Sequence, residues 1–221
     1  MSRPHKLLLA ALTVASLAPT ASLAAEIFGS GTQSLLRGTT TGDFAPPAFY
    51  GGTFPGSFPV VLTEAQARAA VVGAPDNTFL SLPGSGLGPS GSGFTGAYVE
   101  VNFGMNFGAD TTLSIWELGN NEESAHVWLW TNNDGNVQFS FTRGANDQIS
   151  FDLSGYAGTL AVLGATSFTK VGIGGLDAFG ASQGFDLDAV SITPVPEPST
   201  YALMLAGLGV LGWCARRRRG S

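Results

Sequence analysis

The second half of the chain alternates apolar and polar residues in short stretches, and this pattern limits the fold more than any other feature. Residues 98–103, for example, read Tyr, Val, Glu, Val, Asn and Phe. A period of two places successive side chains on opposite faces of a β-strand. We expect further strands at residues 26–28, 111–118, 124–131, 137–143, 148–153, 167–173 and 185–193. About eight short strands between glycine-rich turns predict a mainly β protein, an antiparallel β-sandwich.

Local signals add one turn and one helix to this sandwich. Residues 132–135, Asn-Asn-Asp-Gly, predict a hairpin turn between two of the strands. Residues 63–73 predict one short helix, with Thr63 as N-cap and Gly73 as the stop. Residues 26–59 are rich in Gly, Thr, Pro and Phe, and beyond the first strand we expect them to form long loops over the domain.

The order of several short motifs between residues 73 and 192 resembles a known class of domain. The motifs include Gly-Ala-Pro-Asp-Asn at residues 73–77, Phe-Leu-Ser-Leu at 79–82 and Gly-Phe-Asp-Leu-Asp-Ala-Val at 184–190. In this order they resemble the jelly-roll domains of exported bacterial surface proteins, which are related in architecture to discoidin-like and carbohydrate-binding modules. The resemblance implies a jelly-roll fold and says less about function.

The N-terminal residues 1–24 have the three parts of a secretory signal peptide. Arg3 and Lys6 precede an apolar stretch at residues 7–17, and Ser-Leu-Ala at 22–24 fits a cleavage site. We therefore expect an N-terminal signal helix that is removed after export. The alternative is an uncleaved anchor, although the apolar stretch is short for one.

The C-terminal tail has three physical parts in sequence. Pro196, Glu197 and Pro198 cannot enter a helix interior or a sheet ladder, because both prolines lack an N–H. An uncharged apolar stretch follows at residues 201–215, which predicts a single transmembrane helix stopped by charge. As a helix, residues 199–215 would reach roughly 25 Å, slightly under the ~30 Å hydrocarbon core. The stopping charges are Arg216, Arg217, Arg218 and Arg219.

A buried core helix is the alternative for this stretch, but it would leave four arginines without partners. In order and spacing the tail resembles the sorting tails of PEP-CTERM proteins, found in Gram-negative bacteria that make extracellular polysaccharide. That resemblance implies an exosortase as partner, processing near Pro196–Pro198, and export across the inner membrane to the cell surface or matrix. The expected organisation is a signal peptide at 1–24, an exported domain at 25–193 and the tail at 194–221.

The charged residues are unevenly distributed along the chain. Between residues 25 and 197 there are four Lys or Arg and all sixteen Asp or Glu, a formal charge of −12. Such a surface repels nucleic acid and attracts divalent cations, and it also keeps a protein soluble. The single cysteine, Cys214, lies in the apolar tail, so the exported domain has no disulfide.

The exported domain carries no recognisable catalytic set, and we expect no enzyme activity. Its one histidine, His126, lies in the middle of a predicted strand without a nucleophile elbow nearby. Sixteen acidic residues still offer pairs of carboxylates of the kind that glycoside hydrolysis needs. An undetected polysaccharide hydrolase is therefore a third candidate function.

Two groups of residues are candidate sites. Asp186 and Asp188 fall on one face of a strand at a spacing of two, where like charges favour a bound cation. With oxygen ligands from Asp76 and Asn77 they predict a structural Ca²⁺ site, Glu100 being a weaker choice. The alternative is that these acids cap loops or face water.

The second group is His126, Trp128 and Trp130, which share one face of a predicted strand. Exposed indole rings can stack on the C–H faces of sugars while their N–H groups stay available as donors. The alternative is that the tryptophans pack beneath the N-terminal phenylalanine-rich loops. We therefore expect an exported non-catalytic surface or matrix protein associated with exopolysaccharide, or else a specific lectin-like carbohydrate-binding module.

Overall fold

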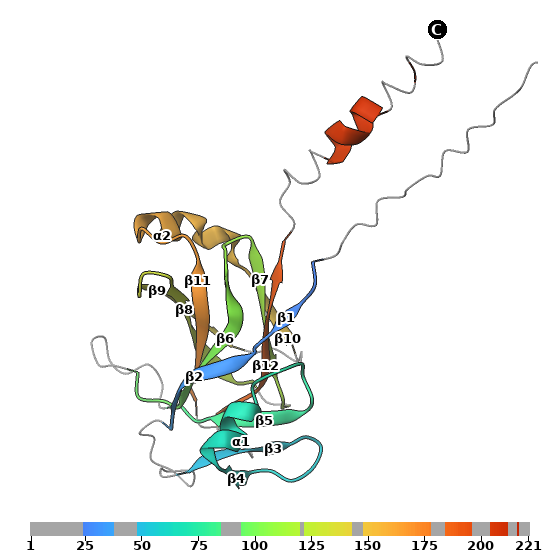
Figure 1. Cartoon of the computed structure of the whole chain (residues 1–221). Coiled ribbons are helices and arrows are strands. Elements are labelled where there is room, and N and C mark those ends of the chain that lie inside the picture. Colours follow the sequence, from blue (N-terminus) through green and yellow to red (C-terminus); the bar gives the residue numbers. More distant parts are fainter. Residues whose placement is uncertain are drawn as a thin grey trace, which may run out of the picture.

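The fold is two antiparallel β-sheets packed face to face, as the alternating strands predicted (Figure 1). The computed structural model describes residues 24–37, 48–84, 94–119, 122–142, 148–177, 184–195, 204–211 and 216. Between the sheets lies one cluster of buried apolar side chains, to which both inner faces contribute. Its largest fully buried members include Phe168 and Phe185.

The larger sheet has seven strands, in the order β10-β7-β12-β5-β3-β4, with β1 paired to β12 beside this path. Within the described residues, its strands pair antiparallel. The strands are β1 (Ile27–Phe28), β3 (Phe49–Thr53), β4 (Val60–Leu62), β5 (Thr78–Leu82), β7 (Thr111–Glu117), β10 (Gln148–Asp152) and β12 (Phe185–Pro194).

The smaller sheet has five strands, in the order β2-β6-β11-β8-β9. They are β2 (Gly31–Leu36), β6 (Tyr98–Phe107), β8 (Ser124–Thr131), β9 (Asn136–Thr142) and β11 (Phe168–Gly175). The predicted turn joins β8 to β9, with Asp134 at a φ of 63°. The inner face of β8 is formed by Ala125, Val127 and Leu129, each 0% exposed, so the outer face belongs to the residues between them.

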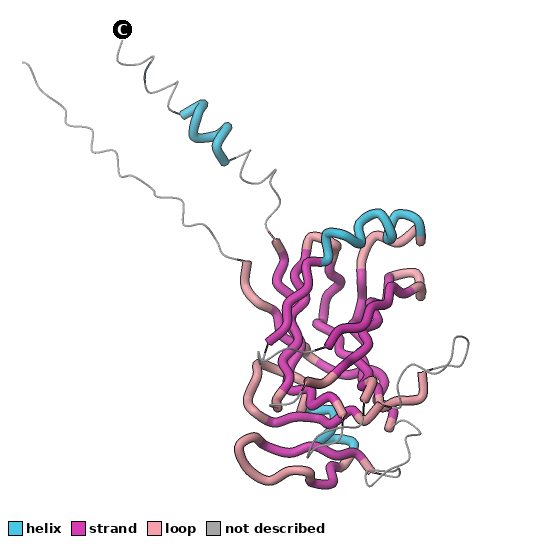
Figure 2. Tube along the Cα trace, turned by 180° about the vertical axis from the view of Figure 1, so that it is seen from behind, coloured by secondary structure: helices cyan, strands magenta, loops and turns pink. Residues whose placement is uncertain are grey.

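The structure has more helices than the one predicted. Helix α1 (Glu64–Ala69) is the expected one, and Thr63 and Gln66 form a capping box at its start. It ends four residues before Gly73, which adopts a φ of 98° and donates its N–H to Gly29 O. A 3-10 helix η1 (Leu153–Tyr156) and helix α2 (Ala157–Val162) were not predicted. Figure 2 shows that α1 and α2 lie towards opposite ends of the strands.

The expectation of long loops over residues 26–59 was wrong where the structure describes this region. Residues 31–36 form β2 in the smaller sheet, and residues 49–53 form β3 in the larger one. Both strands contain glycine and lack the regular alternation of β6, so their extended form comes from pairing with β6 and β5. Such pairing depends on tertiary structure more than on local propensity.

One end of the sandwich carries both of its chain ends. Ile27 of β1 pairs with Ile192 of β12, and Val195 N–H donates to Asp110 O in the turn after β6. Helix α2 lies at the same end (Figure 1). Of the predicted signal peptide only Ala24 lies within the described residues, so the signal helix itself stays a prediction.

Within the predicted transmembrane stretch, residues 204–211 are helical. Considering only the residues that the structure describes, no helix is long and apolar enough to cross a membrane. Residues 196–203, 212–215 and 217–221, which include the Pro-Glu-Pro motif and Arg217 to Arg219, lie outside the described part.

The opposite end of the sandwich is closed by a group of four glycines, which we call the glycine corner: Gly84, Gly96, Gly175 and Gly184. An added Cβ on Gly175 would lie only 1.7 Å from Leu82 O, and one on Gly84 would lie 2.2 Å from Gly175 O. Backbone from β11 of one sheet therefore touches backbone after β5 of the other. Only glycine permits so close an approach.

Candidate ligand-binding face

The three predicted platform residues lie on the outer face of the five-stranded sheet. His126, Trp128 and Trp130 alternate along β8 with the buried residues of the inner face. His126 is 7% exposed, and both tryptophans are half-buried. The pattern of two therefore placed them on one common face, as expected.

Other aromatic rings surround Trp128. Its ring centroid lies 4.9 Å from that of Phe94, 5.0 Å from that of Tyr98 and 4.3 Å from that of His126, all edge to face. In the described residues Trp128 packs against Phe94, which precedes β6, whereas the alternative named the N-terminal phenylalanine-rich loops, which lie partly outside the described residues. We call Phe94, Tyr98, His126, Trp128 and Trp130 the aromatic face.

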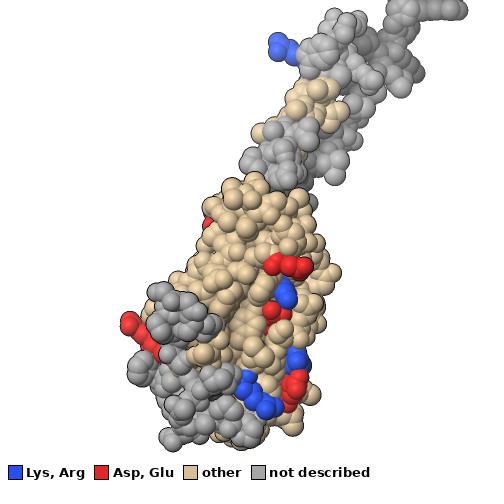
Figure 3. All heavy atoms as spheres, turned by 90° about the vertical axis from the view of Figure 1, so that its left-hand side faces the viewer, with Lys and Arg blue, Asp and Glu red and all other residues tan. Residues whose placement is uncertain are grey.

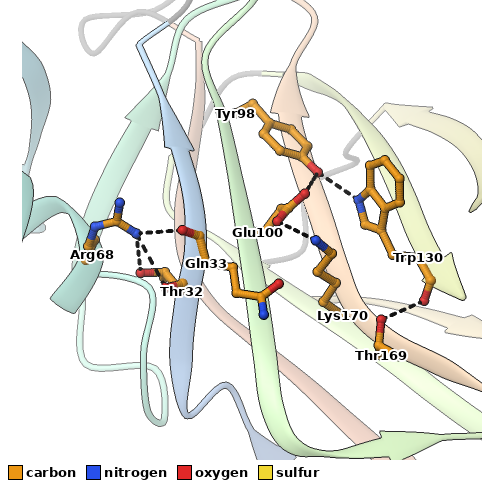
Figure 4. A network of polar contacts seen from close by, with 8 residues as sticks. All are labelled: Thr32, Gln33, Arg68, Tyr98, Glu100, Trp130, Thr169 and Lys170. Atoms are coloured by element: carbon orange, nitrogen blue, oxygen red, sulfur yellow. Dashed lines mark hydrogen bonds and ion pairs between the residues drawn. The ribbon is translucent and has the colours of Figure 1, made fainter. Parts of the chain in front are cut away.

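A chain of polar contacts crosses the aromatic face from β8 through β6 to β11 (Figure 4). The indole N–H of Trp130 donates to Tyr98 Oη at 2.9 Å, and Tyr98 Oη donates to Glu100 Oε1 at 2.9 Å. Lys170 Nζ donates to Glu100 Oε2 at 2.8 Å and lies 5.1 Å from the centroid of the Trp130 ring. These four side chains fix one another in place.

This network changes one part of the platform hypothesis. We expected the indole N–H to remain available for a ligand, but that of Trp130 is already used by Tyr98. Burial raises the pKa of the Tyr98 phenol, and the nearby Glu100 carboxylate raises it further, while the Trp130 bond acts in the opposite direction. Tyr98 therefore stays protonated and keeps its bond to Glu100.

Glycines on β11 make room for these rings. A Cβ on Gly172 would lie 2.2 Å from Tyr98 Oη, and a Cβ on Gly174 would lie 2.5 Å from Phe94 Cζ. The strand beside β8 thus presents backbone where another residue would present a side chain. Ring atoms fill that space, so the aromatic face is a continuous layer of side chains.

His126 is held by the neighbouring strand β9. Its Nδ1 lies 2.7 Å from Ser140 Oγ, and its Nε2 lies 3.2 Å from Gln138 Oε1. The ring is therefore fixed by two neutral partners of the same sheet. This environment suits a structural histidine better than a general base, which must reach a substrate proton.

Charged groups are few on one side of the molecule. Figure 3 shows that face, which is mostly uncharged and on which basic side chains lie beside acidic ones. Two ion pairs account for two of the cations: Lys170 with Glu100, and Arg68 with Glu64 at 2.7 Å. Arg68 also reaches Thr32 on β2 (Figure 4), which ties helix α1 to the five-stranded sheet.

The four residues of the predicted calcium site fall into two groups. Asp188 accepts the backbone N–H of Asp76 at Oδ1, 3.3 Å away, and that of Asn77 at Oδ2, 3.2 Å away. The register of β12 against β7 shifts between residues 187 and 189, so the simple spacing of two breaks there. Burial raises the pKa of Asp188, while the two N–H donors lower it.

Asp186 belongs to a different set of carboxylates, which we call the acidic cluster: Glu117, Glu123, Asp177 and Asp186. Asp186 N–H contacts Glu123 Oε2 at 3.4 Å, and Ser124 N–H donates to Asp177 Oδ2 at 2.6 Å. Burial, followed by repulsion from Asp186, Glu117 and Asp177, raises the pKa of Glu123 to about 9. Glu123 is therefore protonated at neutral pH.

In the described part of the chain no three Asp, Glu, His or Cys side chains are grouped so that they could hold a metal ion. Calcium at Asp76, Asn77, Asp186 and Asp188 stays a prediction. Sequence reasoning named Asp186 but missed Phe94, Lys170 and the other three members of the acidic cluster. These residues come from distant strands or strand ends without a fixed spacing, so no local pattern in the sequence brings them together.

The fold and the tail together define a class of protein: a β-sandwich without disulfides, followed by an apolar tail that ends in arginines. Residues 194–219 match the PEP-CTERM protein-sorting motif. The chain therefore carries a PEP-CTERM sorting tail, which implies export and exosortase-mediated sorting to the outer layers of a Gram-negative bacterium. The match begins at Pro194, the last residue of β12.

Comparison of the whole chain finds only distant structural likeness. No curated protein matches it. One solved structure, a truncated AlyQ with CBM32 and alginate lyase domains, aligns with a TM-score of 0.40 at 12% sequence identity. That alignment covers 79% of this chain and 35% of the other chain, so this chain spans about a third of that protein's length.

Proposed function

We propose that the chain is an exported, non-catalytic surface or matrix protein that is anchored by its tail and associates with extracellular polysaccharide. The observation that carries the proposal is the sorting motif at residues 194–219, which begins where β12 ends. In the proposal, residues 1–24 direct export, residues 25–193 form the exported domain and residues 201–215 span the inner membrane until an exosortase acts.

The shape of the sandwich supports a tethered arrangement. Because β1 and β12 are neighbours, both chain ends leave from one end of the domain. The glycine corner, helix α1 and the acidic cluster lie towards the other end, which would point away from the membrane. With a formal charge of −12 between residues 25 and 197, the domain would also be repelled by anionic lipid.

Removal of the tail tests the sorting function. In a Gram-negative host with an exosortase, the full chain should reach the surface or matrix fraction, and its C-terminal mass should show cleavage near residues 196–198. A chain ended after Thr193 should be exported but absent from that fraction. Equal distribution of both chains would overturn the proposal.

The Pro-Glu-Pro motif offers a matched control for this test. Replacing Pro196, Glu197 and Pro198 by alanine keeps the apolar stretch and all four arginines. This variant should remain in the membrane fraction with its tail intact, because anchoring and processing use different residues. Cleavage at the normal position in this variant would show that the motif is not what the exosortase reads.

The aromatic face favours a second candidate, a specific lectin-like module. Aromatic rings on a sheet surface present apolar area that suits sugar C–H groups. In this candidate Trp128 and Trp130 form the contact surface and Lys170 supplies a cation at its edge. Polysaccharide from the producing cell should then quench tryptophan fluorescence, and Trp130→Ala should weaken the retention of the protein on it at least tenfold.

Trp116, half-buried on the seven-stranded sheet against Phe28, gives the control. Trp116→Phe should leave retention and quenching unchanged, and an equal loss in both variants would reject the aromatic face as the binding surface.

Incubation with the same polysaccharide also tests the third candidate function, a polysaccharide hydrolase. Release of new reducing ends, absent from heat-treated protein, would show a hydrolase and overturn the non-catalytic proposal.

A further inference from the structure

A pocket separate from the aromatic face lies between helix α1 and the β3–β4 hairpin. It has a volume of about 400 Å³, within the ~300–1,000 Å³ range of small-molecule sites. Strands β3 and β4, the turn between them, helix α1 and the start of β5 all contribute to its walls. In Figure 1 these elements form the lower end of the molecule, away from the end at which the chain enters β1 and leaves β12.

The lining of the pocket is amphipathic. Its apolar side includes Val60, which is 38% exposed, and Leu62. The polar residues of its lining include Thr53, Ser57, Gln66, Asp76 and Thr78. A hexose ring also combines apolar C–H groups with hydroxyls, so this mixed lining matches both kinds of group on a sugar.

Asp76 is held in place by two hydrogen bonds, one to its side chain and one from its backbone N–H. Its Oδ1 accepts Thr78 N–H at 2.8 Å, and its own N–H donates to Asp188 Oδ1 at 3.3 Å. The neighbouring loop is fixed by Phe54 N–H, which donates to Asn77 O at 2.9 Å. The carboxylate is thus presented by a braced turn, and a carboxylate accepts paired hydrogen bonds from neighbouring hydroxyls.

The charge of the pocket further limits the chemical class of ligand that it can bind. Among the described residues that line it, Asp76 is the one ionisable side chain. Nearby Arg68 is committed to Glu64 and to Thr32 on the far side of α1. An anionic ligand would be repelled, and one carboxylate among hydroxyls is a poor match for the several charged oxygens that calcium prefers.

We propose that this pocket binds a neutral hexose, as a terminal residue or a short segment of an uncharged glycan. The inference rests on the proposed association with polysaccharide and assigns it a second location. It differs from the aromatic face in place and in chemistry, because a pocket encloses one sugar ring whereas a sheet face supports several.

The test uses the full chain in a detergent without a sugar headgroup. Methyl glycosides of glucose, galactose and mannose serve as probes, with glucuronic acid as the anionic comparison, in saturation-transfer NMR and calorimetry. At least one neutral glycoside should bind, and glucuronic acid should bind at least tenfold more weakly. Binding of glucuronic acid equal to that of the neutral probes, or no binding by any of them, would overturn the proposal.

Two variants locate the binding. Asp76→Asn keeps the oxygen that accepts Thr78 N–H and removes the charge, and Ala69→Trp fills the pocket from an exposed position of α1. Both should reduce affinity at least tenfold with unchanged circular dichroism, whereas Trp130→Ala should leave it unchanged. Loss only in Trp130→Ala would move binding to the aromatic face. The sorting test above needs no sugar, so a failure of the sorting proposal can be told apart from a failure of the pocket proposal.

Discussion

At the scale of single residues, Lys170 holds the aromatic face together. Its ammonium is paired with Glu100, whose side chain is only 6% exposed, and it lies beside the ring of Trp130. Removal of the lysine would leave a buried carboxylate that still accepts a hydrogen bond from Tyr98. An uncompensated buried charge is among the most destabilising changes in a protein.

We therefore predict that Lys170→Met lowers the free energy of unfolding by about 3 kcal/mol in urea denaturation. The double variant with Glu100→Gln should recover most of that loss. The exposed pair Arg68–Glu64 is the control, and Glu64→Gln should cost at most about 0.5 kcal/mol because solvent screens it. Equal losses for the two single variants would contradict this account of the network.

The acidic cluster gives a pH dependence with an unusual sign. Its member Glu123 has a pKa of about 9 in the folded protein, against an ordinary value of 4.5. The folded state therefore holds a proton that the unfolded chain releases above about pH 4.5. The stability that this proton provides is complete below that pH and is lost as the pH rises towards about 9.

We predict that the free energy of unfolding falls between pH 5.5 and 8.5, by at most about 1.4 kcal/mol per pH unit from this group. Glu123→Gln should flatten the slope, because an amide does not titrate. Its exposed neighbour gives the control, and Glu122→Gln should keep the slope. A slope unchanged in Glu123→Gln would show that the proton is held elsewhere.

At the scale of elements, glycine placement decides how closely the two sheets approach. The glycine corner brings the end of β11 against the backbone after β5, and an added methyl group at Gly175 has no room. By contrast, Gly158 in α2 has open space around its Cβ position. Replacement of glycine by alanine at these two positions therefore separates the effect of close packing on stability from the effect of losing a glycine.

We predict that Gly175→Ala destabilises the protein by about 3 kcal/mol or more, since overpacking against backbone cannot be relieved by a rotamer change. Gly158→Ala should stabilise it by about 0.5–1 kcal/mol, because alanine favours a helix. Thermal unfolding of both variants measures the difference. A tolerated Gly175→Ala would show that the two sheets can separate at this corner.

The elements also show which parts of the fold were readable from sequence. Strands β6 to β12 were predicted because their apolar residues alternate and Gly or Asn turns separate them. Strands β2, β3 and β4 were not, because β2 and β3 contain glycine, β4 has only three residues, and pairing with other strands makes these segments extended. Helix α2 was missed because its uncharged sequence Ala-Gly-Thr-Leu-Ala-Val shows no amphipathic period; Leu160 alone is buried in it.

The candidate sites follow the same division. The common face of His126, Trp128 and Trp130 was predictable from one strand, because period two is a local property. Their partners Tyr98, Glu100 and Lys170 lie on β6 and β11, and no spacing in the sequence encodes those contacts. The pocket beside α1 depends on β3, which was taken as a loop, and on β4, which was not assigned, so the pocket could not be predicted.

At the scale of the whole molecule, net charge is the dominant long-range property. With four Lys or Arg against sixteen Asp or Glu between residues 25 and 197, the folded domain repels itself. Salt screens that repulsion, with a Debye length of about 30 Å at 0.01 M and about 8 Å at 0.15 M. Added salt should therefore stabilise the folded state.

We predict that raising NaCl from about 0.01 to 0.15 M increases the Tm by about 2–4 °C, which corresponds to roughly 1 kcal/mol for a domain of this size.

A comparison with CaCl2 at equal ionic strength separates charge screening from specific calcium binding. A larger shift that EDTA reverses would support the predicted calcium ligands Asp76, Asn77, Asp186 and Asp188. Equal shifts, with no effect of EDTA, would reject that site. A Tm that falls with NaCl would contradict the screening argument.

The position of β12 has a consequence for how the molecule is made. The final strand of the sandwich lies between β7 and β5 and also pairs with β1, where Ser191 meets Glu26 across 165 residues of sequence. A ribosome delivers the N-terminus first, so the seven-stranded sheet stays open along its middle until residues 185–194 arrive. Nascent chains therefore expose two unpaired strand edges, and shielding them from one another falls to the cell's chaperones.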